Sequence, residues 1–268
     1  MAHRQHMINI VNGVHRRIVR FLEAKVQVSM GTHRKPIMVI SLHKSGTHLI
    51  ENILKQVGLI SKPAGEDFLP SVFRGLQPNE YIRSHFTPSQ AVYDMIEKGE
   101  VYTIFHYRDP RDVIVSRFNW QHPKNKKVTN VTREFLKKVH SHFKNDQEFL
   151  QFIMRGEKHI KHEIDFSDQF RLSRGLLFHP NVFKTNFETL IGPKGGGDYN
   201  SQIEMIRNLL KYLKLEGDPE QIAKKAFSEQ AETFHKGQIG AYKYFFSQET
   251  EDLFNELHGD ILRDYGYE

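Results

Sequence analysis

The chain has 268 residues, a net charge of +6 and no cysteine, and 38% of its residues are hydrophobic and 26% charged. This composition indicates a globular protein rather than a disordered one, with enough length for one large core. The absence of cysteine excludes disulfide bonds, cysteine metal sites and thiol catalysis. The sequence contains no run of about eighteen apolar residues, the length that a helix needs to cross a membrane. We therefore expect a single domain over residues 1–268, located in the cytoplasm and not bound to a membrane.

The first predicted element is a helix over residues 7–28, where apolar residues recur at mostly helical spacing and basic residues line one side. We interpret it as a helix packed against the domain, and a basic helix on a membrane surface is the alternative. Residues 1–6 are polar and lack the apolar core of a signal peptide. We interpret Met7 as the native start.

A buried strand is predicted for the apolar run from Ile37 to Leu42, and a tight turn and a helix follow it. The turn contains Lys44, Ser45, Gly46 and Thr47. At such a junction the backbone N–H groups of the first helical turn point into one space, with the positive end of the helix dipole behind them. Gly46 lets an anion approach the backbone, and Lys44 adds a full positive charge. The stretch therefore predicts a phosphate or sulfate site, although it lacks the glycine that precedes the lysine of a Walker A loop.

Strands and helices alternate along the rest of the chain. Strands are predicted at 80–86, 101–107 and 181–187, and helices at 49–57, 89–98, from 110 onward, and at 203–213, 219–226 and 248–262. Loops are predicted at 61–77 and in the glycine-rich stretch 192–197, and helical pieces at 131–174. This alternation predicts an α/β fold with a central, mainly parallel sheet flanked by helices.

Three of the predicted strands end in a basic or titratable residue: Lys44, His85 and Arg108. Ligands of parallel sheets bind at the carboxyl ends of the strands, so we expect one crevice to hold all three side chains. Arg108 also opens the segment Arg-Asp-Pro-Arg-Asp at 108–112, which suits a helix start with Asp109 as N-cap. Ser116 follows about two helical turns into that helix.

These segments resemble the sulfotransferases that use 3′-phosphoadenosine-5′-phosphosulfate (PAPS). The 5′-phosphosulfate loop of that family usually reads Pro-Lys-Ser-Gly-Thr-Thr-Trp, and this chain has His-Lys-Ser-Gly-Thr-His-Leu at 43–49. The family's 3′-phosphate motif is Arg-Asp-Pro-Arg-Asp followed by Ser, as at 108–116 here. The resemblance implies a P-loop-like three-layer fold. It also implies a 5′-phosphosulfate site at Lys44, Ser45, Gly46, Thr47 and His48, and a 3′-phosphate site at Arg108 and Ser116.

Two further segments near the C-terminus extend the resemblance. Residues 235–240 match the family's Arg-Lys-Gly-x-x-Gly pattern except at the first position. The match implies that His235, Lys236 and Gly237 also hold the 3′-phosphate, the histidine more weakly because arginine stays charged at all relevant pH values. Phe227 resembles a phenylalanine that contacts the adenine, and it would stack on that base. The chain departs from the family pattern at Leu49 for tryptophan, Phe187 for tyrosine and His235 for arginine.

The segment Arg-Ser-His at 83–85 resembles the Lys-Thr-His segment whose histidine is the family's catalytic base. The resemblance implies that His85 is the general base and that Lys44 stabilises charge on the transferred group. The chain has 16 histidines. His43, His48 and His106 therefore stay open as alternative bases.

The implied function is transfer of a sulfuryl group from PAPS to a hydroxyl, or an amine, of a small-molecule acceptor by in-line displacement, which leaves adenosine 3′,5′-bisphosphate (PAP). No metal ion is expected, because the strand ends carry Lys, His and Arg rather than a carboxylate. Residues 122–175 are expected to cap the acceptor pocket. The short chain suggests a bacterial natural-product enzyme of secondary metabolism, while the acceptor and the oligomeric state stay undetermined.

Two alternatives remain open at this stage. A P-loop kinase acting on a small molecule would bind ATP and Mg²⁺. A non-catalytic nucleic-acid-binding protein would use the net charge of +6. The basic residues are scattered apart from the run at 124–127, so we expect no nucleic-acid partner.

Overall fold

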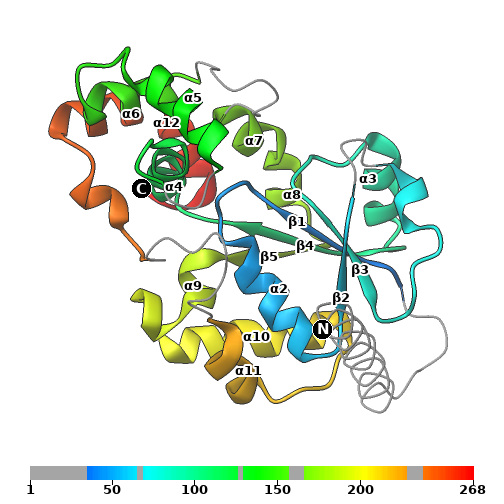
Figure 1. The fold of residues 1–268 in the computed structure, drawn as a ribbon. Helices are drawn as coiled ribbons and strands as arrows, with labels where there is room; N and C mark the ends of the chain where they lie inside the picture. The colour runs from blue at the N-terminus through cyan, green and yellow to red at the C-terminus, as the bar shows by residue number, and fades with distance from the viewer. Residues whose placement is uncertain (1–34, 65–68, 126–128, 157–165, 228–237) are drawn as a thin grey trace, which may run out of the picture.

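The computed structural model describes residues 35–64, 69–125, 129–156, 166–227 and 238–268. Its centre is a five-stranded sheet in the order β2-β3-β1-β4-β5, and every neighbouring pair is parallel (Figure 1). The strands are β1 (Ile37–Ser41), β2 (Ile60–Pro63), β3 (Glu80–Ser84), β4 (Tyr102–Tyr107) and β5 (Val182–Asn186). The predicted helix at 7–28 and the predicted site residues His235, Lys236 and Gly237 lie outside the described residues.

Helices cover both faces of the sheet, as Figure 1 shows. One face carries α2 (Thr47–Gln56), α9 (Phe187–Ile191), α10 (Tyr199–Leu213) and α11 (Pro219–Ala226). The other carries α3 (Gln90–Glu97), α4 (Pro110–Gln121), α6 (Asp146–Met154), α7 (Phe166–Leu172), α8 (Arg174–Phe178) and α12 (Gln248–Tyr265). The remaining elements are α5 (Asn130–His140) and the 3₁₀ turns η1 (Pro70–Phe73), η2 (Pro193–Gly195) and η3 (Ala241–Tyr244). No helix of the described segments has both the length and the apolar character needed to span a bilayer.

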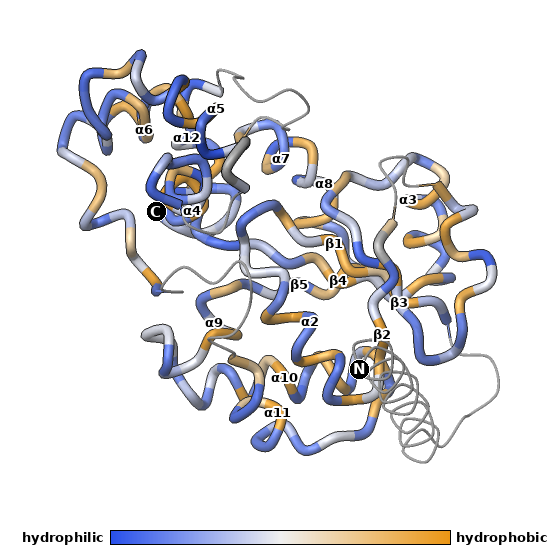
Figure 2. Tube along the Cα trace, viewed as in Figure 1, coloured by the Kyte–Doolittle hydropathy of each residue, from blue (hydrophilic) through white to orange (hydrophobic). Residues whose placement is uncertain are grey.

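The two hydrophobic cores follow from the alternation of side chains along β1. Ile37 and Val39 pack in the core with α2 and α10, whereas Met38 and Ile40 pack in the core with α4 and α12. All four side chains are at most 1% exposed. In Figure 2 the apolar colouring appears on the central strands and on parts of the helices on both sides of the sheet. A strand buried on both faces reads as a continuous apolar run, and for this reason the sequence predicted it correctly.

The predicted α/β fold with a parallel sheet between helices is confirmed. The predicted strands at 37–42, 80–86, 101–107 and 181–187 are β1, β3, β4 and β5, each within two residues at either end. Asp109 is the N-cap of α4, and its side chain accepts a hydrogen bond from the Arg111 N–H. The predicted loop at 61–77 is wrong at its start, because β2 pairs with β3 there. This edge strand has the sequence Ile-Ser-Lys-Pro, and such a polar, proline-ended strand gives no apolar run to detect.

The hydroxyl of Tyr212 links the beginnings of β4 and β5. It accepts a hydrogen bond from the Thr103 N–H at 2.9 Å and lies 2.9 Å from the carbonyl oxygen of Asn181, to which it donates. We expect Tyr212→Phe to lower the free energy of unfolding by about 1–3 kcal/mol, because it leaves a part-buried N–H without a partner. Urea unfolding measures the change, with Tyr244→Phe as the control because that side chain is 89% exposed. Equal stability of the two variants would contradict the prediction.

Candidate functional site

The loop between β1 and α2 has an unusual backbone. Lys44 and Gly46 both adopt left-handed conformations, with φ of 65° and 88°. Gly46 is the N-cap of α2, and no side chain caps this helix. The first turn of α2 therefore presents its backbone N–H groups and the positive end of the helix dipole at the carboxyl edge of the sheet, which is the arrangement that binds anions.

Three hydroxyl groups hold this loop from inside. The Ser45 hydroxyl donates to the carbonyl oxygen of Leu42 at 2.5 Å. The Ser41 hydroxyl lies 3.0 Å from the Ser45 hydroxyl and 2.9 Å from the Thr47 hydroxyl. All three serine and threonine side chains are buried. The hydroxyl groups that the sequence assigned to anion binding thus take part in shaping the loop.

Lys44 extends from the loop toward α4. Its ammonium lies 4.2 Å from the centre of the Trp120 ring, which is the distance of a cation–π contact. Trp120 is the single tryptophan of the chain. Sequence reasoning gave it no role, because the pairing joins residues far apart in the chain.

His85 follows the end of β3 and lies beside the same loop. Its Nδ1 is 2.6 Å from the carbonyl oxygen of Ser41. A carbonyl oxygen only accepts, so Nδ1 carries the proton and Nε2 has the lone pair. The Arg83 guanidinium lies 3.5 Å from Nε2, which is too long for a good hydrogen bond.

His85 is stacked on His43, with ring centres 4.4 Å apart and planes at 28°. Burial lowers the pKa of His85 below its ordinary value. Burial, with the nearby His85, also lowers the pKa of His43 to about 3. Both imidazoles are therefore neutral at pH 7, the form in which a histidine can accept a proton.

The two other candidate histidines have different surroundings. His106 is fully buried, and its ring bonds to the Thr185 hydroxyl at 2.9 Å and to the carbonyl oxygen of Ser45 at 3.0 Å. Both of its ring nitrogens are thus occupied, so it supports the loop rather than facing a ligand. His48 is 46% exposed, and its Nδ1 lies 3.0 Å from Glu51.

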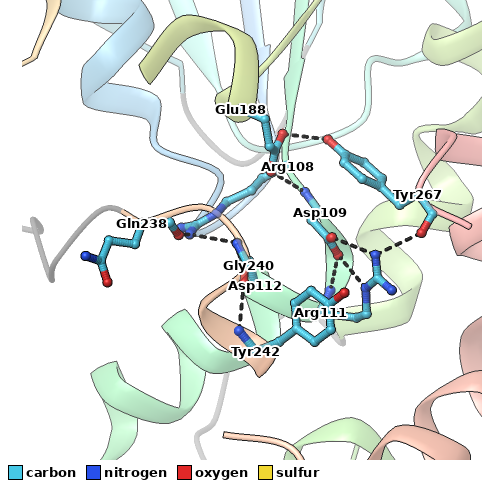
Figure 3. A network of polar contacts seen from close by, with 9 residues as sticks. All are labelled: Arg108, Asp109, Arg111, Asp112, Glu188, Gln238, Gly240, Tyr242 and Tyr267. Carbon is cyan, nitrogen blue, oxygen red and sulfur yellow. Dashed lines mark hydrogen bonds and ion pairs between the residues drawn. The ribbon is translucent and has the colours of Figure 1, made fainter. Parts of the chain in front are cut away.

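Arg108 lies in a buried polar network (Figure 3). Its guanidinium donates to the carbonyl oxygen of Gln238 at 2.9 Å and to the Asp112 carboxylate at 3.3 Å. The Asp112 carboxylate also accepts the N–H groups of Gly240 at 2.9 Å and Tyr242 at 3.0 Å. These bonds fix the segment that follows the predicted 3′-phosphate residues 235–237 beside the start of α4. Within the described structure, Nε of Arg108 is buried and has no hydrogen-bond partner.

The ring of Phe187 contacts both the loop and Arg108. The Arg108 guanidinium carbon lies 4.1 Å from the ring centre. A Cβ added to Gly46 would lie 2.5 Å from the same ring, so only glycine fits there. Phe187 replaces a tyrosine of the sulfotransferase pattern, and the contacts here are made by its ring. The loop and Arg108 therefore both contact one aromatic side chain, the loop at the ring edge and Arg108 over the ring.

Two further predicted site residues lie on elements next to this centre. Ser116 is half-buried on α4, one helical turn after Asp112 and on the same face. Phe227 is half-buried at the C-cap of α11, and the Lys194 ammonium lies 5.5 Å from its ring centre. The structure thus brings the Lys44 loop, His85 and Arg108 to the adjacent carboxyl ends of β1, β3 and β4.

A second set of contacts around the start of α4 was missed by sequence reasoning (Figure 3). Glu188 accepts hydrogen bonds from the Asp109 N–H at 3.0 Å and from the Tyr267 hydroxyl at 2.7 Å. Arg111 binds the Asp109 carboxylate at 2.8 Å and the carbonyl oxygen of Tyr267 at 2.8 Å. Tyr267, which follows α12, therefore holds the end of β4 and the neighbouring Arg108 in place.

Solved structures with this arrangement of elements include a mouse sulfotransferase, SULT7A1, complexed with PAP. It matches with a TM-score of 0.60 and 15% identity, over 88% of this chain and 86% of its own. Retinol dehydratase complexed with retinol and PAP matches with a TM-score of 0.54 and 16% identity, over 91% of this chain and 86% of its own. Its complex with androsterone and inactive cofactor PAP gives 0.53 and 14%, over 91% and 85%.

The chain has the sulfotransferase fold. This confirms the P-loop-like, three-layer architecture expected from the two motifs. No protein-family model and no curated protein matches the sequence. The likeness is therefore one of three-dimensional arrangement, and the short motifs are the sequence features that accompany it.

The buried, neutral His106 makes folding stability depend on pH. Burial lowers the pKa of His106 from 6.5 to about 4, so the unfolded chain binds a proton in this range that the folded chain does not. Its contribution to stability is present above pH 6.5 and is lost as the pH falls toward 4, by about 3 kcal/mol in total. We expect His106→Gln to lose less stability over this pH range than the wild type, measured by urea unfolding. The exposed His142 provides the control variant His142→Gln. Parallel pH curves for the wild type and His106→Gln would rule out this role.

Proposed function

We propose that the protein is a PAPS-dependent sulfotransferase that transfers a sulfuryl group to a small-molecule acceptor. The observation that carries the proposal is a pair of groups suited to bind anions that both contact the ring of Phe187. One is the Lys44 loop at the start of α2, and the other is Arg108 at the end of β4. PAPS and PAP carry phosphate groups at both the 5′ and the 3′ position of one nucleoside, and the chain has the fold of structures solved with PAP.

In this proposal the loop residues hold the 5′-phosphosulfate group: Lys44, Ser45, Gly46, Thr47 and His48. The 3′-phosphate is held by Arg108 and Ser116 together with His235, Lys236 and Gly237. Phe227 contacts the adenine. Two features of the described residues fit such a ligand. Nε of Arg108 is a buried donor without a partner, and α2 begins at a glycine without a side-chain cap. Both offer hydrogen-bond donors to an anion.

His85 is the proposed general base. Its Nε2 takes the proton of the acceptor hydroxyl while the acceptor oxygen forms a bond to the sulfur and the bond from sulfur to the phosphate oxygen breaks. The carbonyl oxygen of Ser41 holds Nδ1–H, which keeps the lone pair on Nε2. Lys44 and the N–H groups of the loop stabilise negative charge on the sulfuryl oxygens and on the departing phosphate. His85, Ser41 and Lys44 supply no carboxylate that could bind a metal ion, and the proposed chemistry requires no metal ion.

Nucleotide binding tests the proposal against its two rivals. We expect one PAP to bind per chain by calorimetry without Mg²⁺, at least about tenfold more tightly than ATP with Mg²⁺. Arg108→Lys should weaken PAP binding by about 10–100-fold, because lysine lacks the forked donor geometry, and should change AMP binding far less.

Arg171→Lys is the control for this experiment, because Arg171 forms an exposed ion pair with Asp260. Thermal unfolding checks that the Arg108 variant is folded. Tighter binding of ATP with Mg²⁺ would favour a kinase. Binding to polynucleotide that falls steeply with salt, without selective PAP binding, would favour a nucleic-acid-binding protein.

Turnover tests the general base. Removing a general base typically costs about 10²–10⁴-fold in rate, so we expect His85→Asn to lose that much turnover while PAP affinity stays nearly unchanged. His142→Asn is the matched control, since His142 is exposed and lies outside the proposed site. The lowered pKa of His85 also predicts that turnover of the wild type falls only below the ordinary histidine range as the pH decreases. Full turnover of His85→Asn would instead point to His43 or His48.

The acceptor is the least determined part of the proposal. We propose a small molecule with a hydroxyl or amine group, bound under the helices of residues 122–175, in a cytoplasmic enzyme of bacterial secondary metabolism. Support comes from the solved complexes of retinol dehydratase, which hold retinol or androsterone. Screening candidate acceptors with labelled PAPS identifies the group that receives the sulfate.

A further inference from the structure

A cluster of three metal-ligating side chains lies outside the site described above. His122 is the C-cap of α4, His140 is the last residue of α5 and Asp146 is the first residue of α6. Nε2 of His122 lies 3.3 Å from Oδ1 of Asp146, and Nε2 of His140 lies 3.1 Å from the same oxygen. The ligand atoms of the three residues lie within 4.8 Å of one another.

The spacing of these atoms suits a small divalent metal ion. Zn²⁺ binds imidazole nitrogen and carboxylate oxygen at about 2.0–2.1 Å, so neighbouring ligand atoms in a tetrahedral site are about 3.3 Å apart. The two distances from Asp146 Oδ1 already have this length. A shift that brings the two imidazoles closer together completes the geometry.

Packing holds both imidazole rings in place. The His122 ring centre lies 5.2 Å from that of Phe118, and the His140 ring centre lies 5.1 Å from that of Phe149. The two imidazoles meet edge to face, 4.8 Å apart. Asp146 is 55% exposed, so water can complete the coordination shell. Ligands fixed by packing lose less freedom when a metal binds.

The geometry points to a Zn²⁺-binding site at His122, His140 and Asp146 that cross-links α4, α5 and α6. Imidazole and carboxylate ligands suit Zn²⁺, and the same donors bind Ni²⁺ and Cu²⁺. The inference is independent of the proposed sulfuryl transfer, because none of the three residues belongs to the Lys44 and Arg108 centre.

Metal binding changes the proton positions of His122. The Lys124 N–H donates to its Nδ1 at 3.1 Å, so Nε2 carries the ring proton. A metal bound at Nε2 requires this proton to move to Nδ1, and the contact with Lys124 has to open. The opening of this contact opposes binding, so we expect an affinity weaker than that of a site built for zinc alone.

Trp120 gives the site a spectroscopic reporter. It lies two residues before His122 on the same helix and is the single tryptophan of the chain. Ni²⁺ and Cu²⁺ quench indole fluorescence over short distances. Ni²⁺ or Cu²⁺ bound at the cluster therefore quenches the fluorescence of Trp120. Zn²⁺ that displaces the quenching ion restores the emission.

The test uses the full chain with Zn²⁺ alone in calorimetry and with Ni²⁺ in Trp120 quenching. We expect Asp146→Asn and His140→Asn each to weaken Zn²⁺ binding by about tenfold or more, since even indirect partners of metal ligands have effects of this size. His142→Asn is the matched control, because His142 is exposed and lies two residues from His140. His48→Asn controls for a metal bound near the loop. Thermal unfolding with and without Zn²⁺ checks that each variant is folded.

The expected result is one Zn²⁺-competed quenching site that both cluster variants lose and both control variants keep. Zn²⁺ should also raise the unfolding temperature of the wild type but not of the cluster variants. Unchanged quenching and unchanged Zn²⁺ affinity in Asp146→Asn and His140→Asn would overturn the inference. So would loss of quenching in His48→Asn alone.

Discussion

The arrangement around Arg108 depends on the hydrogen bonds that the Asp112 carboxylate accepts. Asp112 is 1% exposed, and it joins α4 to backbone N–H groups 128 and 130 residues further along the chain. Burial raises the pKa of Asp112, while Arg108 and the two N–H groups favour its ionised form. A buried carboxylate is tolerated only when its charge and oxygens are satisfied, so the C-terminal segment and Arg108 are stabilised together. Loss of either partner would therefore destabilise the position of the other.

Contacts with buried side chains likewise constrain the loop at the end of β1. A lysine in the left-handed region, as at Lys44, costs of order 1–3 kcal/mol and persists only where its surroundings fix it. Here the Ser41 hydroxyl, the His106 ring and the edge of the Phe187 ring all contact the loop. The strain therefore belongs to a loop held rigid before any ligand arrives. Rigid placement of donors lowers the reorganisation needed when an anion binds.

The sequence predicted those parts of the fold that depend on local patterns. Apolar runs located β1, β3, β4 and β5, and the cap chemistry of Asp109 located the start of α4. The parallel topology then followed from the alternation of strands and helices, and with it the convergence of three strand ends. Long-range pairings were out of reach, because they depend on where distant segments pack. The contact of Lys44 with Trp120 and the short edge strand β2 both belong to this class.

Helix α4 shows how one element combines both kinds of information. Val113, Ile114 and Phe118 pack into the core, so the apolar residues do not form a single narrow stripe. Arg108, just before the helix, is followed at intervals of four residues by Asp112, Ser116 and Trp120. Residues four apart lie on nearly the same side of a helix, with a slow drift around the axis. Within this row of residues, Asp112 accepts the N–H of Gly240, and the Trp120 ring contacts the Lys44 ammonium. A single helix of twelve residues thus links Arg108 to the Lys44 loop, because residues at this spacing of four lie on nearly the same side of it.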